Sequence, residues 1–216
     1  MPESVRETTA EYSASVPTLC SGDVLDAVEF QRRYEAAPET INAERINGKV
    51  YLMAALRAAR HGDPHALLAG WLFHYALAAP ELTVSDNASI RLDADNDPQP
   101  DLCLRRTGGA TRLVDDYIQG PPELIVEIAG SSASYDFGEK RNVYQAAGVG
   151  EYIVFETFEG RIEWWHNSSG GFVDVPLAEE VYQSQVFPGL WLDARALRAG
   201  DDVGLIATLQ RGMKAT

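Results

Sequence analysis

Three charged residues have types and spacing that could bind a divalent cation. The first, Glu127, interrupts the apolar run LIVEIA at residues 124–129, which is typical of a strand covered on both faces. A carboxylate in such a strand is costly unless it is paired, hydrogen-bonded or bound to a metal. Taken alone, the run is equally compatible with a strand at the sheet edge, with Glu127 facing water.

The other two are Asp101 and Lys140. Asp101 follows a proline at the start of another predicted strand, where acidic residues are common, so alone it favours a structural role. Combined with Glu127, it provides two carboxylates that adjacent strands could place around one hard cation. Lys140 lies on the same side of a predicted helix as Phe137 and Tyr144. Its ammonium there either reaches the surface or meets a buried acid.

The elements that must position these residues alternate between helices and strands. Helices are predicted over residues 23–37, 65–79 and 136–147, followed by a C-terminal helical tail. The second helix is almost entirely apolar, which predicts burial on more than one side and makes His74 a core histidine. In the third, Asp136 and Glu139 have capping-box spacing and Gly148 suits the position after the end. Strands are predicted at 41–46, 49–53, 82–85, 89–92, 101–105, 124–129, 152–155, 161–166, 172–175 and 182–186, with Asn47-Gly48 as a tight turn and 106–122 as a connection.

This alternation predicts an α/β fold, a mixed β-sheet flanked by helices with antiparallel hairpins. The 216 residues, 45% of them apolar, suffice for one core. We expect a flexible leader over residues 1–20 and a single domain over 21–216. No apolar stretch approaches the roughly 18 residues of a membrane span, and the N-terminus is polar, so a soluble cytoplasmic protein is expected. Cys20 and Cys103 fit neither a metal-ligand spacing nor a disulfide framework.

The charge and the nucleophile content limit the function classes. A formal net charge of -14 disfavours nucleic-acid binding unless a local basic patch overcomes it. No Ser or Cys lies in a recognisable nucleophile motif, so a triad-type enzyme is disfavoured. The patch candidates are more typical of ordinary solvated charges: Arg32, Arg33, Arg105, Arg106, Arg112, Lys140 and Arg141.

Two segments carry a resemblance to a known family. PQPDLCLR and PPELIVEIAGSSASYDFGEKRNVYQAAGVGEYIVFE resemble the Uma-two family of proposed restriction endonucleases, within the PD-(D/E)xK, restriction-endonuclease-like superfamily. The resemblance covers most of residues 25–195, including Glu44 before INGKVYLM, His65, and VFPGLWLD. It implies a restriction-endonuclease-like fold and a magnesium- or manganese-dependent endonuclease (a hydrolase) that acts on DNA, often as a homodimer. Trp164, Trp165 and Trp191 could contribute to a dimer interface or to the core.

The resemblance also implies residue roles. Asp101 and Glu127 would bind the metal, with the Ala129 carbonyl as a further ligand, and Lys140 would position the attacking water. The superfamily usually has its lysine two residues after the glutamate, where this chain has Ala129, so Lys140 would replace it from the following helix. Glu44 could be an additional ligand, although alone it is typical of a surface acid. His65 matches a family histidine of unassigned role and alone is typical of a helix end.

Two alternatives to a DNA endonuclease stay open. The acidic net charge, and Ala129 at the position where the superfamily usually has its lysine, are also compatible with a catalytically inactive nuclease-fold module that binds a protein or a nucleic acid. A hydrolase that uses the same cation on another substrate is the second alternative, although no residue specifies that substrate.

Overall fold

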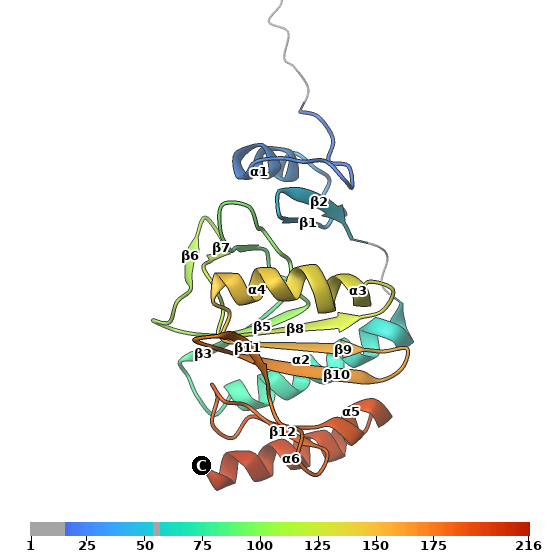
Figure 1. Ribbon diagram of the computed structural model, residues 1–216, viewed down its shortest axis with the longest axis vertical. Helices are drawn as coiled ribbons and strands as arrows, with labels where there is room; N and C mark the ends of the chain where they lie inside the picture. The colour runs from blue at the N-terminus through green and yellow to red at the C-terminus, as the bar shows by residue number, and fades with distance from the viewer. Residues whose placement is uncertain (1–15, 54–56) are drawn as a thin grey trace, which may run out of the picture.

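A six-stranded mixed sheet forms the centre of the computed structural model, which describes residues 16–53 and 57–216 (Figure 1). Its strand order is β11-β10-β9-β8-β5-β3. β8 and β9 are parallel, and the other neighbouring pairs are antiparallel. The strands are β3 (Leu82–Asp86), β5 (Leu102–Arg106), β8 (Leu124–Ala129), β9 (Glu151–Glu156), β10 (Arg161–Ser168) and β11 (Gly171–Asp174).

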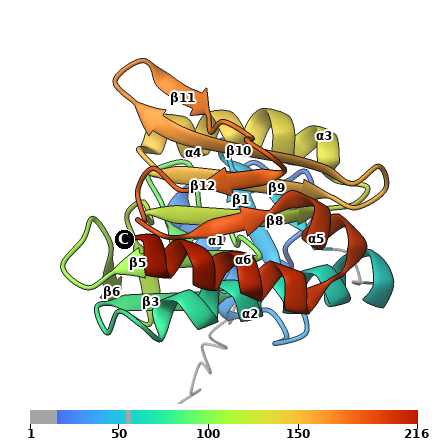
Figure 2. The ribbon, with the colours of Figure 1, turned by 90° about the horizontal axis from the view of Figure 1, so that it is seen from below.

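Helices cover both faces of this sheet (Figures 1 and 2). One face carries α2 (Asp63–Ala76), preceded by the π-helical turn η1 (Ala58–Gly62), together with α5 (Ala194–Ala199) and α6 (Asp202–Ala215). The other carries a nearly continuous helix made of α3 (Ala133–Tyr135), the π-helical turn η2 (Asp136–Lys140) and α4 (Arg141–Ala147). The predicted α/β class, a mixed sheet flanked by helices with antiparallel hairpins, is confirmed.

β8 contributes to two cores because its side chains alternate between the faces of the sheet. Leu124, Val126 and Ile128 join the core under α2 and α6, while Ile125 and Ala129 join the core under α4. All six residues of β8 are buried, since the strand lies between β9 and β5 and is covered on both faces. The sheet-edge interpretation of Glu127 is therefore wrong.

The N-terminal part of the described chain adds a small unit above α4 (Figure 1). It contains α1 (Ala27–Glu35) and the hairpin of β1 (Ala43–Ile46) and β2 (Lys49–Leu52), next to a three-stranded sheet of β4 (Ile90–Arg91), β7 (Tyr117–Gln119) and β6 (Arg112–Val114). Asn47 and Gly48 have φ values of 50° and 75°, as the predicted two-residue turn requires.

Buried Arg45 attaches this hairpin to the segment before β5. Its backbone exchanges hydrogen bonds with Asp97, and its guanidinium lies 2.7 Å from the Asp97 carboxylate. The guanidinium also donates to the carbonyls of Leu25 and Ala94. Because side chains alternate along a strand, the neighbouring Glu44 points to the opposite side, towards the main sheet.

Several local expectations need correction. α2 is not buried all round, because Phe73 on it and Leu77 just after its end are 59% and 69% exposed, and His74 is half-buried rather than a core histidine. Asp136 does not cap its helix, since the helical turns begin at Ala133. Residues 106–122 are not a plain connection, because they contain β6 and β7. The strand predicted at 182–186 is shorter and earlier, β12 (Val181–Gln183), and it pairs with β13 (Trp191–Asp193).

Two further points concern the leader and the tryptophans. Residues 1–15 of the predicted leader lie outside the described residues, while Leu19 packs in a small core with Phe30, Ala43 and Val50. Trp164 and Trp165 are core residues, 1% and 4% exposed. Within residues 16–53 and 57–216, no helix is long and apolar enough to cross a membrane.

Candidate functional site

The predicted site residues Asp101 and Glu127 lie on adjacent strands. Leu102 pairs with Val126 in the antiparallel register of β5 and β8, so Asp101, just before β5, lies beside the second half of β8. The Ile128 amide donates to Asp101 Oδ2 at 2.6 Å, and the Asp101 amide donates to Glu127 Oε2 at 3.4 Å. The end of β8 therefore fixes the Asp101 carboxylate next to that of Glu127.

Lys140 reaches the same place from the helix above. Its Nζ lies 2.7 Å from Glu127 Oε1 and 3.1 Å from Glu44 Oε2. The side chain does not extend to the surface, because Lys140 is only 3% exposed. Glu44 is 2% exposed and also accepts a hydrogen bond from the Gln99 amide, so its interpretation as a surface acid is wrong.

Asp136 is a further acid in this cluster that the sequence analysis took for a capping residue. Asp136, Lys140 and Tyr144 are spaced four residues apart, so the helix directs all three towards β8. The Asp136 carboxylate lies 3.9 Å from Lys140 Nζ and accepts a hydrogen bond from Ser132. Tyr144 donates its hydroxyl hydrogen to Glu127 Oε1 at 2.9 Å. Asp136 was missed because its four-residue spacing from Lys140 was not considered.

The electrostatics follow from burial and from the excess of acid over base. Burial raises the pKa of Glu127 well above its usual range, although Lys140 opposes the shift. Burial likewise raises the pKa of Asp136 to about 6, again against Lys140. Burial lowers the pKa of Lys140, but Glu127, Glu44 and Asp136 together outweigh it and keep the ammonium charged. The carboxylates of Glu127, Glu44 and Asp136 thus share one lysine, with the Asp101 carboxylate beside them, an arrangement that favours a further cation.

His61 is a second residue that the sequence analysis did not identify. It lies on η1, with Nε2 3.1 Å from Asp101 Oδ1 and Nδ1 3.2 Å from the Ile128 carbonyl oxygen. Nε2 is buried and has no hydrogen bond of good geometry within the described chain. The Asp101 carboxylate raises the pKa of His61 against the effect of burial. The available signal was the spacing from His65, one helical turn later.

His65, expected at the helix end, lies in the first turn of α2. Its Nε2 lies 3.1 Å from the Asp101 carbonyl oxygen and 3.1 Å from Asp86 Oδ1, and its ring stacks on that of His61. It therefore contacts the backbone of Asp101 and the carboxylate of Asp86, and not the carboxylates of the cluster around Lys140. Nothing in these contacts assigns it a chemical role.

The structure corrects the predicted carbonyl ligand. The Ala129 carbonyl accepts a hydrogen bond from the Thr157 amide in the β8–β9 ladder, so it is directed away from Asp101. The Ile128 carbonyl lies on the β5 side of the strand, where the Ile128 amide binds Asp101. Of the two carbonyls, only that of Ile128 faces the carboxylates.

The donor chemistry fits a small divalent cation. Asp101, Glu127 and the Ile128 carbonyl offer oxygen ligands from neighbouring strands, and Glu127 Oε2 receives only the 3.4 Å contact from the Asp101 amide among the residues that the structure describes. No three His, Cys, Asp or Glu side chains among residues 16–53 and 57–216 form a metal-binding group. Mg²⁺ does not need three, because it commonly uses one or two carboxylates and keeps several waters.

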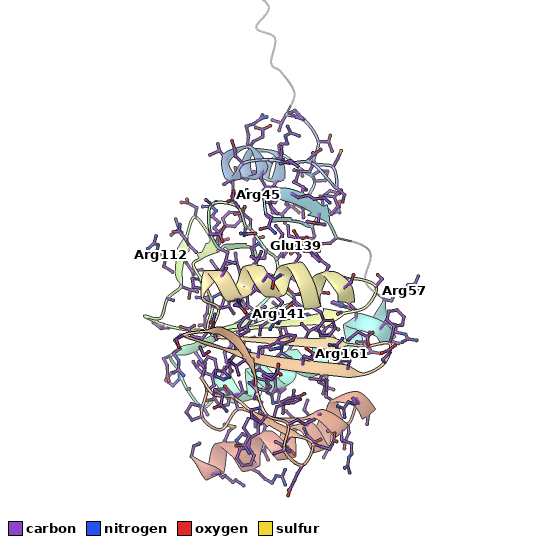
Figure 3. All side chains as sticks on the ribbon, in the orientation of Figure 1. Arg45, Arg57, Arg112, Glu139, Arg141 and Arg161 are labelled. Atoms are coloured by element: carbon purple, nitrogen blue, oxygen red, sulfur yellow. The ribbon has the colours of Figure 1, made fainter. Side chains whose placement is uncertain are left out.

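The N-terminal hairpin is held over the site by one acid on η2. Glu139, labelled in Figure 3 between the hairpin and the helix, accepts hydrogen bonds from the Asn47 amide group at 2.9 Å and from the Tyr51 hydroxyl at 3.1 Å. Because η2 also carries Lys140, these bonds fix the helix relative to Glu44 on β1. The site is thus assembled from the N-terminal hairpin, η1, the start of β5, the end of β8, and η2.

Comparison with known proteins assigns the family. A family model, Uma2, described as "Putative restriction endonuclease", matches residues 27–195. The chain belongs to the Uma2 family. This confirms the resemblance found in the sequence, and with it a nuclease-type family. No curated protein matches the chain.

A solved structure shares the fold of this Uma2 protein. It is described as "a putative nuclease belonging to DUF820 from Anabaena variabilis ATCC 29413", and the match has a TM-score of 0.63 at 13% sequence identity. The match covers 78% of this chain and 97% of the other. At that identity the likeness shows the fold alone.

Proposed function

We propose that this Uma2 protein is a metal-dependent endonuclease that hydrolyses phosphodiester bonds of DNA. The observation that supports it best is the convergence of Asp101, Glu127 and Lys140, with Lys140 Nζ 2.7 Å from Glu127 Oε1 in a buried acidic cluster. Buried carboxylates in excess of their cationic partners are unfavourable for folding alone, so their presence favours a function that uses them.

Asp101, Glu127 and the Ile128 carbonyl would hold Mg²⁺ or Mn²⁺ in this proposal. When bound, such an ion stabilises negative charge on the phosphate and makes water more acidic. The Ile128 amide fixes the Asp101 carboxylate, and Tyr144 and Lys140 fix that of Glu127. The Lys140 ammonium would orient the attacking water through a donor hydrogen and offset charge on the phosphate. Glu44 would hold Lys140 in place.

The proposal also includes the oligomeric state and the cellular location of the protein. We expect the protein to act as a homodimer, because a second copy would allow both DNA strands to be cut, and to act in the cytoplasm. Sedimentation velocity over a range of concentrations tests the dimer. A monomer at all concentrations would contradict that part and leave the chemistry unaffected.

A cleavage assay on supercoiled and single-stranded DNA tests the proposal. We expect cutting with Mg²⁺ or Mn²⁺, none with EDTA, and none by the Asp101→Asn variant, which keeps the side-chain shape but loses the charge. Asp174→Asn, an exposed acid on the edge strand β11, is the matched control and should cut normally.

Cleavage that survives Asp101→Asn would contradict the assignment of this site. If calorimetry showed no binding of Mg²⁺ or Mn²⁺ at millimolar concentrations and no DNA were cut, the inactive binding module would be favoured instead. Calorimetry on Asp101→Asn separates a metal-binding defect from a folding defect, because thermal unfolding of the same sample reports the fold.

A further inference from the structure

We infer that Phe158 and Arg60 form a stacking platform for an unpaired nucleobase beside the candidate site. The inference rests on the proposed nuclease function and names its substrate class as nucleic acid with unpaired bases. Phe158 lies on the turn between β9 and β10, and Arg60 lies on η1. Figures 1 and 2 place this turn at the same end of the sheet as the start of α2 and α3.

Phe158 is an exposed ring on a fixed backbone. It is 59% exposed, so its ring is accessible to a ligand. Glu156 accepts hydrogen bonds from the amides of Phe158 and Glu159, at 2.6 and 2.9 Å, so the turn is rigid. A base that stacks on this ring would therefore cost little conformational entropy.

Arg60 connects the ring to the candidate site. Its guanidinium carbon lies 4.6 Å from the Phe158 ring centroid, and Nη1 donates to the Thr157 carbonyl. The Thr157 hydroxyl donates in return to the Arg60 carbonyl at 2.8 Å. The next residue, His61, contacts the Asp101 carboxylate. His61, next to Arg60 on η1, thus links the platform to Asp101, a proposed metal ligand.

The local charge at this end also suits a phosphate backbone. Arg60 forms no salt bridge with any residue in the described ranges, and it is exposed. Arg161, at the start of β10, lies over Phe137 of η2 at 4.2 Å, but it is paired with Glu163 and adds no free charge. Figure 3 places Arg57 towards this end of the molecule, and within the described ranges it forms no salt bridge either. In a chain with a net charge of -14, Arg57 and Arg60 supply the local cations that a polyanion requires.

The aromatic contribution specifies unpaired bases. Bases of an intact duplex are stacked on each other and cannot cover a protein ring, whereas single-stranded or extruded bases stack on aromatic rings and on guanidinium planes. Phe158 with Arg60 offers both surfaces in contact with each other. The pair therefore favours a single strand, or a flipped base, over an intact duplex.

Binding measurements on the full chain test the platform without requiring cleavage. The probe is a single-stranded oligonucleotide carrying 2-aminopurine, compared with its duplex, and both are titrated into the Asp101→Asn protein by fluorescence anisotropy. We expect Phe158→Ala to weaken single-strand binding by roughly 5- to 150-fold and to abolish the quenching of 2-aminopurine. Phe158→Trp should restore both.

Phe73→Ala is the matched control, because Phe73 on α2 is also 59% exposed and has no arginine over its ring among the described residues. It should bind as the unsubstituted protein does. Arg60→Gln should lower the slope of log affinity against log salt by about one, and Glu159→Gln should strengthen binding.

Equal loss of binding in Phe158→Ala and Phe73→Ala, or binding of the duplex as tight as that of the single strand, would overturn the inference. These outcomes are independent of cleavage. Failure of the nuclease proposal would appear instead as a lack of cutting by the unsubstituted protein that still binds the strand.

Discussion

Replacing Lys140 with methionine should destabilise the fold strongly, because it leaves buried carboxylates without their cation. Methionine fills a similar volume but removes the ammonium that lies 2.7 Å from Glu127, 3.1 Å from Glu44 and 3.9 Å from Asp136. Loss of one partner of a buried ion pair costs about 3–5 kcal/mol. For a chain of this length that corresponds to a fall in Tm of roughly 6–20 °C.

The loss should depend on pH in a defined direction. Burial already raises the folded-state pKa of Asp136 to about 6, so the folded protein binds this proton more tightly than the unfolded chain does. Stability contributed by that proton is present at low pH and is lost as the pH rises through about 6. Without Lys140 the pKa values of Asp136 and Glu127 rise further. The destabilisation should therefore be larger at pH 8 than at pH 5.

Urea denaturation followed by tryptophan fluorescence measures the effect, since Trp165 lies in the core under α4. The control is Lys49→Met, an exposed lysine on β2, which should change stability by less than about 0.5 kcal/mol. A loss below about 1 kcal/mol for Lys140→Met at pH 8, or no difference between pH 5 and pH 8, would refute the buried-cluster argument.

Three further predictions concern other parts of the fold. Gly212→Ala should destabilise the protein by about 1–3 kcal/mol in thermal unfolding, because an added Cβ would meet the Gly189 carbonyl oxygen and lie 2.6 Å from the Trp191 ring. The control Gly70→Ala on α2 should be stabilising, because its added Cβ meets nothing within 4 Å. Equal effects of the two substitutions would contradict this prediction. Arg45→Met should cost about 3–5 kcal/mol in urea denaturation, since Asp97 and two carbonyls lose their donor, and a neutral outcome would be inconsistent with the buried pair. Iodoacetamide should label exposed Cys20 but not Cys103 in the native state, because burial raises the pKa of the Cys103 thiol to about 11. Mass spectrometry of the labelled protein measures which cysteine is modified. Labelling of Cys103 in the native protein would argue against its burial.

The local elements could be predicted because their signals are contiguous in the chain. β8 has the bounds that its apolar run predicts, and Asn47-Gly48 forms the predicted turn because few residue pairs tolerate two positive φ angles. Gly148 ends α4 in the left-handed conformation for the same reason, with a φ of 86°. In each case the physical cause acts within a few residues.

The composition of the site was only partly predictable. Glu127 could be found because a carboxylate is unusual in an apolar strand, and Asp101 and Lys140 could be found through their combination with Glu127 and the family resemblance. Asp136 and His61 were missed, because an acid in a helix and a histidine in a turn are common and their four-residue spacings from Lys140 and His65 are weak signals. The choice between the Ala129 and Ile128 carbonyls depends on which strand lies on each side of β8, and the sequence does not state strand order.

By itself, then, the sequence determined the α/β class and the family, and it singled out Asp101, Glu127 and Lys140. Only the tertiary structure decided that Glu44 is buried at the site, that η1 brings His61 to Asp101, and that the β9–β10 turn places Phe158 against Arg60. The reason is physical. Periodicity and turn chemistry are local properties of the chain, whereas burial, pKa and pairing depend on elements that the fold brings together from as far apart as residues 44 and 140.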